Sequence, residues 1–215
     1  MIQVTDTGRM DGLPSSPHPI ITGLSVSLVT LGGMEFAEVF VADGPRPELA
    51  AEMALFEPLI GSWALRVFNY ADDGNVAEIS AEWHFSWALD GRAVADVWIA
   101  PSRAERGADR SGEWGLTLRF YDPGINAWRS TWHGPGRGLV LPFTARPSED
   151  GIILSARADD IEHRWIFSEL TADSFRWRRE ETAPDGTTVI RQRFEATRAR
   201  DVLAAGPTNG TSGAP

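Results

Sequence analysis

Residues 78–89 read EISAEWHFSWAL, and this stretch decides the fold class. Apolar and polar side chains alternate along it with a period of two, which is the pattern of a β-strand with one apolar and one polar face. Asp90-Gly91 follows directly and is typical of a tight turn. The apolar face contains Ile79, Ala81, Trp83, Phe85, Trp87 and Leu89, and the polar face contains Glu78, Ser80, Glu82, His84 and Ser86.

The same kind of run recurs along the chain, between turn signals rich in Asp, Gly and Pro. No segment with helical periodicity separates these runs, so βαβ units are not expected. We predict an all-β fold, a single antiparallel up-and-down barrel of about 8 to 10 strands, because a closed sheet has no free edges. The other runs are residues 63–68, 93–100, 113–121, 127–133, 138–145, 152–158, 161–169, 175–182 and 187–197.

Three regions make up the predicted domain organisation. Residues 1–47, rich in Gly, Pro and Ser, are expected to form a partly flexible N-terminal arm, residues 48–200 the barrel, and residues 201–215 a disordered tail. A short helix is predicted from Pro47 to about Leu59, since apolar residues recur there at helical spacing and Pro47 suits a first turn. Met34 is an alternative start of translation.

Composition excludes several functional classes. The formal net charge of −10 disfavours binding to nucleic acid or to an anionic membrane surface. Cysteine and lysine are both absent, which excludes thiol chemistry and lysine Schiff bases. The apolar run at residues 20–32 is too short for a transmembrane helix and lacks a basic flank, so a cytoplasmic location is expected.

The segment Leu59-Ile60-Gly61-Ser62-Trp63 resembles the Gly-x-Trp signature that opens the first strand of lipocalins and their calycin relatives. The chain is also similar to an uncharacterised bacterial lipocalin-like family over roughly residues 48–198. The resemblance implies that Trp63 closes one barrel end, with Arg191 or Arg193 from the last strand stacked on its ring. The shared features are Gly-Ser-Trp, the hairpin at residues 89–92, the turn at residues 120–123, and Trp128 and Trp132 after it.

Nine tryptophans suggest either an aromatic pocket for a flat or hydrophobic ligand or a tightly packed core. Which face of residues 78–89 points inward is left open. An apolar interior, which the lipocalin resemblance favours, puts Trp83 and Trp87 in the cavity and His84 in solvent; the reverse puts Glu82 and His84 inside. The predicted ligand-binding residues are Trp83, His84, Trp87, Trp98, Arg119, Trp132, His163 and Trp165.

Asp96 is the carboxylate most suggestive of acid–base chemistry, because it stands between Val94 and Trp98 on one strand face. It is either paired with an arginine or held with a raised pKa. Asp96, Tyr121 and His133 are the predicted catalytic residues, on the hypothesis that they converge inside the barrel. No metal site and no cofactor are predicted, although three strand histidines, His84, His133 and His163, leave a metal or haem site as a weaker alternative.

Two functions therefore remain open. The first is binding of a small hydrophobic or aromatic molecule in the barrel. The second is a cofactor-independent isomerase, cyclase or hydratase that acts on such a molecule, because the fold permits either. The expected partner is a small-molecule ligand or substrate, and a homodimer is left open. The arginines of residues 176–193 are expected to form a salt-bridge ladder with Glu180, Glu181 and Glu195.

Overall fold

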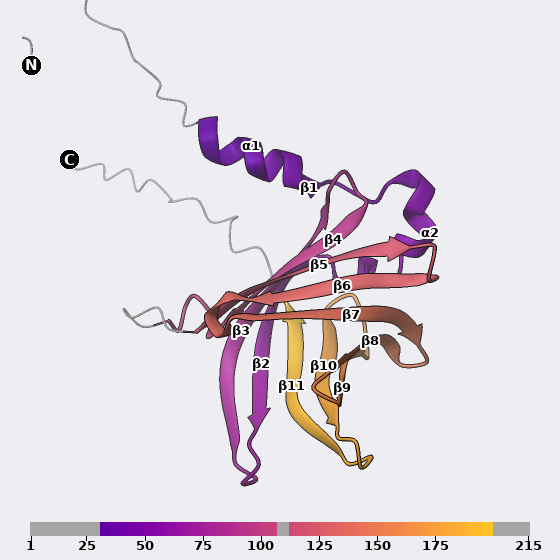
Figure 1. The fold of residues 1–215 in the computed structure, drawn as a ribbon. Helices are drawn as coiled ribbons and strands as arrows, with labels where there is room; N and C mark the ends of the chain where they lie inside the picture. The colour runs from indigo at the N-terminus through magenta and orange to yellow at the C-terminus, as the bar shows by residue number, and fades with distance from the viewer. Residues whose placement is uncertain (1–30, 107–111, 200–215) are drawn as a thin grey trace, which may run out of the picture. The chain divides into compact units, whose positions relative to one another are not determined.

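The computed structural model describes residues 31–106 and 112–199, with side chains from residue 36 onward. Its strands belong to one antiparallel sheet in which β2 to β11 close into a barrel, so the predicted barrel is confirmed. Figure 1 shows β4 to β7 running across the direction of β2, β3, β10 and β11. The strands are β1 (Val41–Ala42), β2 (Gly61–Tyr70), β3 (Val76–Ala88), β4 (Ala93–Ala100), β5 (Glu113–Asp122), β6 (Ala127–Gly134), β7 (Leu139–Ser148), β8 (Gly151–Ala158), β9 (Ile161–Ser168), β10 (Ser174–Thr182) and β11 (Thr188–Arg198).

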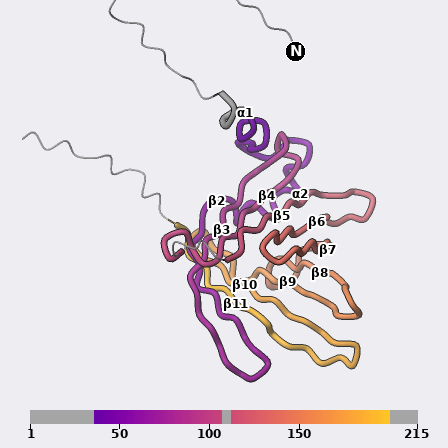
Figure 2. Tube along the Cα trace, turned by 60° about the vertical axis from the view of Figure 1, so that its left-hand side comes forward, coloured from indigo at the N-terminus to yellow at the C-terminus, as the bar shows by residue number. Residues whose placement is uncertain are grey.

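Neighbours in the chain are neighbours in the barrel, except that β11 returns to pair with β2. Figure 2 shows this succession of hairpins from a second direction. Positive φ angles occur at the tight turns, for example at Asp159 and Asp160 between β8 and β9, as two-residue hairpin loops require. The two-residue β1 pairs with Trp87 and Ala88, beyond the end of β2 on the same side of β3.

The apolar face of β3 points into the barrel. Trp83, Phe85 and Trp87 belong to the main buried cluster, each less than a tenth exposed. His84 lies on the opposite face, where Nδ1 is 2.9 Å from the Ser62 hydroxyl and Nε2 is 3.1 Å from Glu82. The alternative with a polar interior is therefore wrong for this strand, because the barrel core takes the side with the larger apolar area.

Short helical turns close one end of the barrel, where a helix over Pro47–Leu59 was predicted. They are η1 (Pro47–Leu49), α2 (Ala50–Met53) and η2 (Glu57–Leu59), with Met53, Phe56 and Leu59 completely buried. Pro58 within η2 prevents one continuous helix, since proline cannot donate a main-chain hydrogen bond.

Trp63 is covered by an arginine, as the resemblance implies, but the residue is Arg198. Its guanidinium carbon lies 4.1 Å from the Trp63 ring centroid, and its nitrogens donate to the carbonyls of Ile60 and Pro58. The prediction of Arg191 or Arg193 is wrong because Trp63 pairs with Arg198 in the β2–β11 register. Gly61 makes this stack feasible: a Cβ there would lie 2.6 Å from an Arg198 nitrogen.

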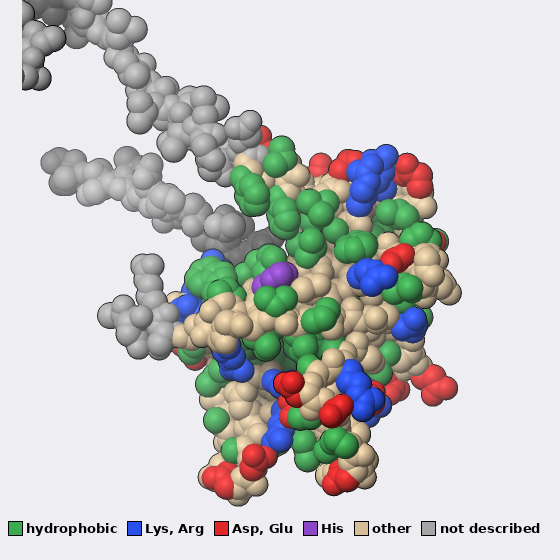
Figure 3. Space-filling view, in the orientation of Figure 1, with side chains coloured by type: hydrophobic (Ala, Val, Ile, Leu, Met, Phe, Trp, Pro, Cys, Tyr) green, Lys and Arg blue, Asp and Glu red, His purple; other side chains and the backbone are tan. Residues whose placement is uncertain are grey.

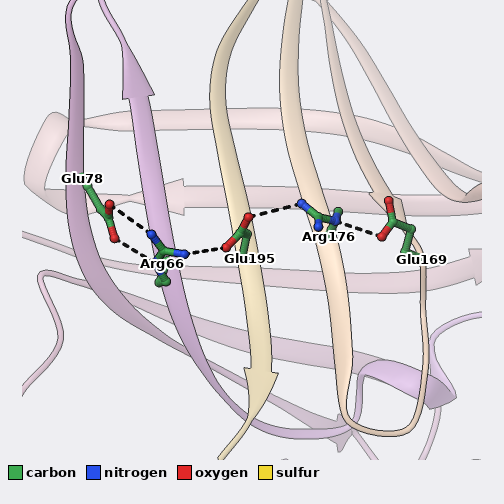
Figure 4. Close-up of polar contacts among 5 residues, drawn as sticks. All are labelled: Arg66, Glu78, Glu169, Arg176 and Glu195. Atoms are coloured by element: carbon green, nitrogen blue, oxygen red, sulfur yellow. Dashed lines mark hydrogen bonds and ion pairs between the residues drawn. The ribbon is translucent and has the colours of Figure 1, made fainter.

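Two kinds of surface cover the outside of the barrel. Across β3, β2, β11 and β10 runs the ladder Glu78–Arg66–Glu195–Arg176–Glu169, shown in Figure 4. This ladder contains one of the predicted pairs, Arg176–Glu195. The predicted arginines Arg178, Arg179 and Arg191 form ion pairs apart from it, with Glu180, Glu181 and Glu181, and Arg193 lies over the Tyr70 ring. Hydrophobic side chains gather instead over β4 and β5 beside α1 (Figure 3).

Helix α1 (Leu31–Phe40) falls inside the region predicted as an arm and was not anticipated. Its last residue, Phe40, packs on a small outer cluster of Ala88, Ala93 and Ala95. Residues 1–30 of the arm and the predicted tail at 201–215 lie outside the described residues. Among the helices of residues 31–106 and 112–199, none has the length and apolar composition needed to span a membrane.

Candidate functional site

Five aromatic side chains form a closed circuit around the inside of the barrel. We call Trp98, Trp132, Trp165, Trp177 and Phe194 the aromatic belt; they come from β4, β6, β9, β10 and β11. Each ring touches the next, with centroid separations of 6.0, 5.9, 5.6 and 4.2 Å along that order and 5.9 Å from Phe194 back to Trp98. Such edge-to-face and stacked contacts hold flat rings in defined orientations.

The aromatic belt lines a cavity in which about 610 Å³ is free of protein atoms, its open mouth included. Trp83 also lines it and contacts the belt at 5.7 Å from Phe194 and 6.1 Å from Trp177. Little of this space is wide enough for a water molecule to move in, so the gaps between the rings are narrow. A narrow slot between aromatic rings suits a flat molecule better than a globular one. The remaining lining residues are Glu113, Arg137, Leu139, Leu141, Arg179 and Gln192.

Gly115 provides the space that Trp132 occupies. It lies on the inner face of β5, and a Cβ there would fall 1.9 Å from the Trp132 ring. No larger residue fits unless the ring moves. The glycine is therefore part of the site, although a glycine in the middle of a strand is costly by itself.

Three tryptophans of the aromatic belt have buried indole N–H groups without a hydrogen-bond partner among the described residues. They are Trp98, Trp165 and Trp177. Trp83 differs, because its N–H donates to Asp96 Oδ1 at 2.7 Å. Buried polar groups in proteins are nearly always paired, so three unpaired donors in one cavity wall are exceptional.

A polar cluster adjoins the aromatic belt where β9, β10 and β11 continue toward their hairpins. Arg179 lines the cavity and forms an ion pair with Glu181. Glu181 also accepts a hydrogen bond from Arg191 Nε at 2.8 Å. Burial alone would raise the pKa of the Glu181 carboxyl, but hydrogen bonds from these arginines lower it below its ordinary value. His163 lies 3.6 Å from Glu181, and burial lowers the pKa of its imidazole.

Asp96 and Arg119 form an ion pair that is almost completely buried, with exposed side-chain fractions of 0% and 1%. The guanidinium lies over the rings of Phe56 and Phe85, 5.0 and 5.6 Å from their centroids. Burial raises the pKa of the Asp96 carboxyl, and the contacts with Arg119 and Trp83 oppose that rise. Both expectations for Asp96 are met, since it pairs with Arg119 and its pKa is raised, but it lies outside the residues that line the cavity.

The three predicted catalytic residues do not converge. Tyr121 packs against the main core, and its hydroxyl donates to Asn126 at 2.6 Å. His133 is exposed, because Trp132 before it takes the inward position on β6. The three strand histidines do not meet either: His84 and His133 point outward and His163 inward. Among the described residues there is no group of three or more acidic or histidine side chains that could hold a metal ion.

Of the predicted ligand-binding residues, Trp83, Trp98, Trp132 and Trp165 line the cavity. Trp87 is in the core and Arg119 in the buried ion pair, while His84 is on the outside and His163 in the polar cluster. The sequence analysis missed Glu113, Arg179 and Trp177 as site residues. Trp177 and Arg179 are two positions apart on β10, so alternation puts them on one face, but the sequence does not show that this face points inward.

No family model and no curated protein matches the chain. Solved structures that resemble it include the S-type phycobiliprotein lyase CPES from Guillardia theta, 14% identical with a TM-score of 0.48, covering 69% of this chain and 93% of that one. Another is Rv2717c from M. tuberculosis, 16% identical with a TM-score of 0.49, covering 73% of this chain and 99% of that one. At these identities the likeness concerns the fold alone. Membership of the bacterial lipocalin-like family stays a prediction.

Proposed function

We propose that this protein binds a small, flat, largely apolar molecule inside the aromatic belt. The observation that carries this proposal is the closed circuit of five rings around an open-mouthed cavity. A barrel that needed only a core would fill this space with aliphatic side chains, which pack without leaving polar N–H groups unpaired. Aromatic walls with a few polar groups at the mouth are typical of ligand pockets.

The enzyme alternative has less support, because Asp96, Tyr121 and His133 are not brought together. Glu113 is the carboxylate that lines the cavity; its Oε1 accepts the Gly136 N–H at 3.0 Å and Oε2 lies 3.8 Å from Arg137. An enzyme that transfers a proton in this cavity would have Glu113 as its nearest carboxylate, whereas a templated cyclisation would need no such group. A cytoplasmic location stays a prediction.

A matched pair of substitutions on β7 tests the binding proposal. Leu141 lines the cavity, whereas Val140 beside it is 60% exposed. Fluorene, a flat neutral hydrocarbon, is titrated into the protein while tryptophan fluorescence is followed. Saturable quenching is expected for the wild type and for Val140→Trp, and its loss for Leu141→Trp, whose larger ring fills the cavity. Equal binding by both variants, or no binding by the wild type, would contradict the proposal.

We also propose that the exposed apolar face of β5 pairs with the same face of a second copy of the chain. On β5, Trp114 and Phe120 are 50% and 44% exposed, with Leu116 and Leu118 between them on the same face. An exposed apolar patch of this kind marks an interaction surface, and twofold pairing brings identical patches together. Sedimentation equilibrium should show a dimer for the wild type and a monomer for Phe120→Glu. Val76→Glu, at a 52% exposed position beside the ion-pair ladder, is the control that should remain dimeric.

A further inference from the structure

We infer that the molecule held by the aromatic belt carries oxygen acceptors, such as carbonyl or carboxylate groups, on its flat framework. This inference rests on the proposed function and adds the ligand's chemical class. The observation behind it is that several residues of the cavity wall have buried hydrogen-bond donors without a partner among the described residues.

The buried unpaired groups of the residues that line the cavity are all donors. Trp98, Trp165 and Trp177 each present an indole N–H, and Arg179 presents its Nε–H; all four nitrogens are buried and lack a partner among the described residues. Indole and guanidinium groups donate hydrogen bonds and cannot accept them. A ligand that only donates leaves all four unsatisfied, whereas a ligand with acceptors can satisfy them.

Two of the lining residues carry side-chain acceptors, Glu113 and Gln192. Glu113 accepts the Gly136 N–H and faces Arg137. Gln192 donates from its amide nitrogen to Asn69 Oδ1 at 2.6 Å. The cavity wall therefore has more unpaired donors than it has residues with side-chain acceptors. An unsatisfied buried donor carries a full desolvation penalty, so an acceptor on the ligand gains more here than a neutral hydrogen bond normally does.

Two ligands with the same framework separate this inference from the proposed function. Fluorene and 9-fluorenone have nearly the same flat shape, but fluorenone carries one carbonyl oxygen. Water solvates that oxygen, so a purely apolar cavity prefers fluorene. A cavity wall with unpaired donors should reverse this preference, and we expect fluorenone to bind about tenfold tighter or more.

Tryptophan-to-phenylalanine substitutions locate the donors, because phenylalanine keeps an aromatic ring and removes the N–H. Trp165→Phe and Trp177→Phe should each reduce the ratio of fluorenone affinity to fluorene affinity, whatever the change does to the binding of fluorene itself. Trp83→Phe is the matched control: Trp83 lines the same cavity, but its N–H is already used by Asp96. Its preference for fluorenone should match that of the wild type. Urea unfolding of each variant verifies that it is folded.

The outcomes are distinct. Tighter binding of fluorenone, lost in the Trp165 and Trp177 variants, supports the inference. Equal binding of the two ligands, or tighter binding of fluorene, overturns the inference and leaves the proposed function standing. If neither ligand binds the wild type, the proposed function fails and the inference fails with it. If a variant does not fold, the comparison of the two ligands on the wild type still decides.

Discussion

The buried pair of Asp96 and Arg119 permits a quantitative test of the barrel's electrostatics. Asp96→Asn keeps an oxygen for the Trp83 N–H but removes the negative charge, which leaves Arg119 charged and 1% exposed beside Phe56 and Phe85. A guanidinium cannot lose its proton in a protein. Breaking a buried ion pair in this way costs about 3–5 kcal/mol of unfolding free energy.

The reverse substitution has a different consequence. Arg119→Met leaves Asp96 without its cation, but this carboxyl can become neutral by binding a proton, so the loss at neutral pH should be smaller. Burial raises the pKa of Asp96 in the folded protein, and removal of Arg119 raises it further. The folded state then binds more protons than the unfolded state between the two pKa values. The stability of Arg119→Met therefore increases as the pH falls, by up to about 1.4 kcal/mol per pH unit.

Urea unfolding followed by tryptophan fluorescence measures both effects. With a slope of about 2 kcal/mol per molar urea, Asp96→Asn should shift the midpoint by about 2 M. The double variant Asp96→Asn/Arg119→Met should be more stable than Asp96→Asn, because no buried charge remains. A loss below about 1 kcal/mol for Asp96→Asn, or a double variant no more stable than it, would refute the assignment of a desolvated ion pair.

Three further predictions concern other parts of the barrel. Arg198→Met should lower the free energy of unfolding, measured in urea, by about 2–4 kcal/mol, because it loses the stack on Trp63 and the hydrogen bonds to carbonyls. The control is Arg193→Met, at an arginine 5.7 Å from the Tyr70 ring, which should lower it much less. Gly115→Ala should displace the Trp132 ring, cost about 1–3 kcal/mol and weaken fluorene binding, and unchanged affinity would show that the ring is not held in the cavity wall. Burial alone would raise the pKa of Glu82, but hydrogen bonds from Arg103 and His84 lower it to about 2. The stability that this lowered pKa contributes is present above the unfolded pKa of 4.5 and is lost as the pH falls toward 2. Glu82→Gln should therefore flatten the pH dependence of the unfolding midpoint in that range, and parallel profiles of variant and wild type would contradict the prediction.

Local sequence determined where the strands lie, to within a few residues at their ends. Alternation over residues 78–89 and the turn at Asp90-Gly91 correspond to β3 and its hairpin, because alternation and turn propensity depend on residues within a few positions of each other. Gly61-Ser62-Trp63 likewise indicated the start of the first long strand, and the lipocalin resemblance implied an arginine on its tryptophan. The strands and turns require no knowledge of distant strands.

Only the tertiary structure decided which side chains meet. The β2–β11 register selects Arg198 as the partner of Trp63, and Arg191 and Arg193 lie further along the strand. The shift in register opposite Arg179 and Glu180 is also invisible in the sequence. On β6, Trp132 points inward and the next residue, His133, points outward, so His133 does not reach the predicted catalytic residues inside the barrel. Register is a property of the whole closed sheet, because every strand must match two neighbours at once, and a slip of one residue exchanges the inner and outer faces.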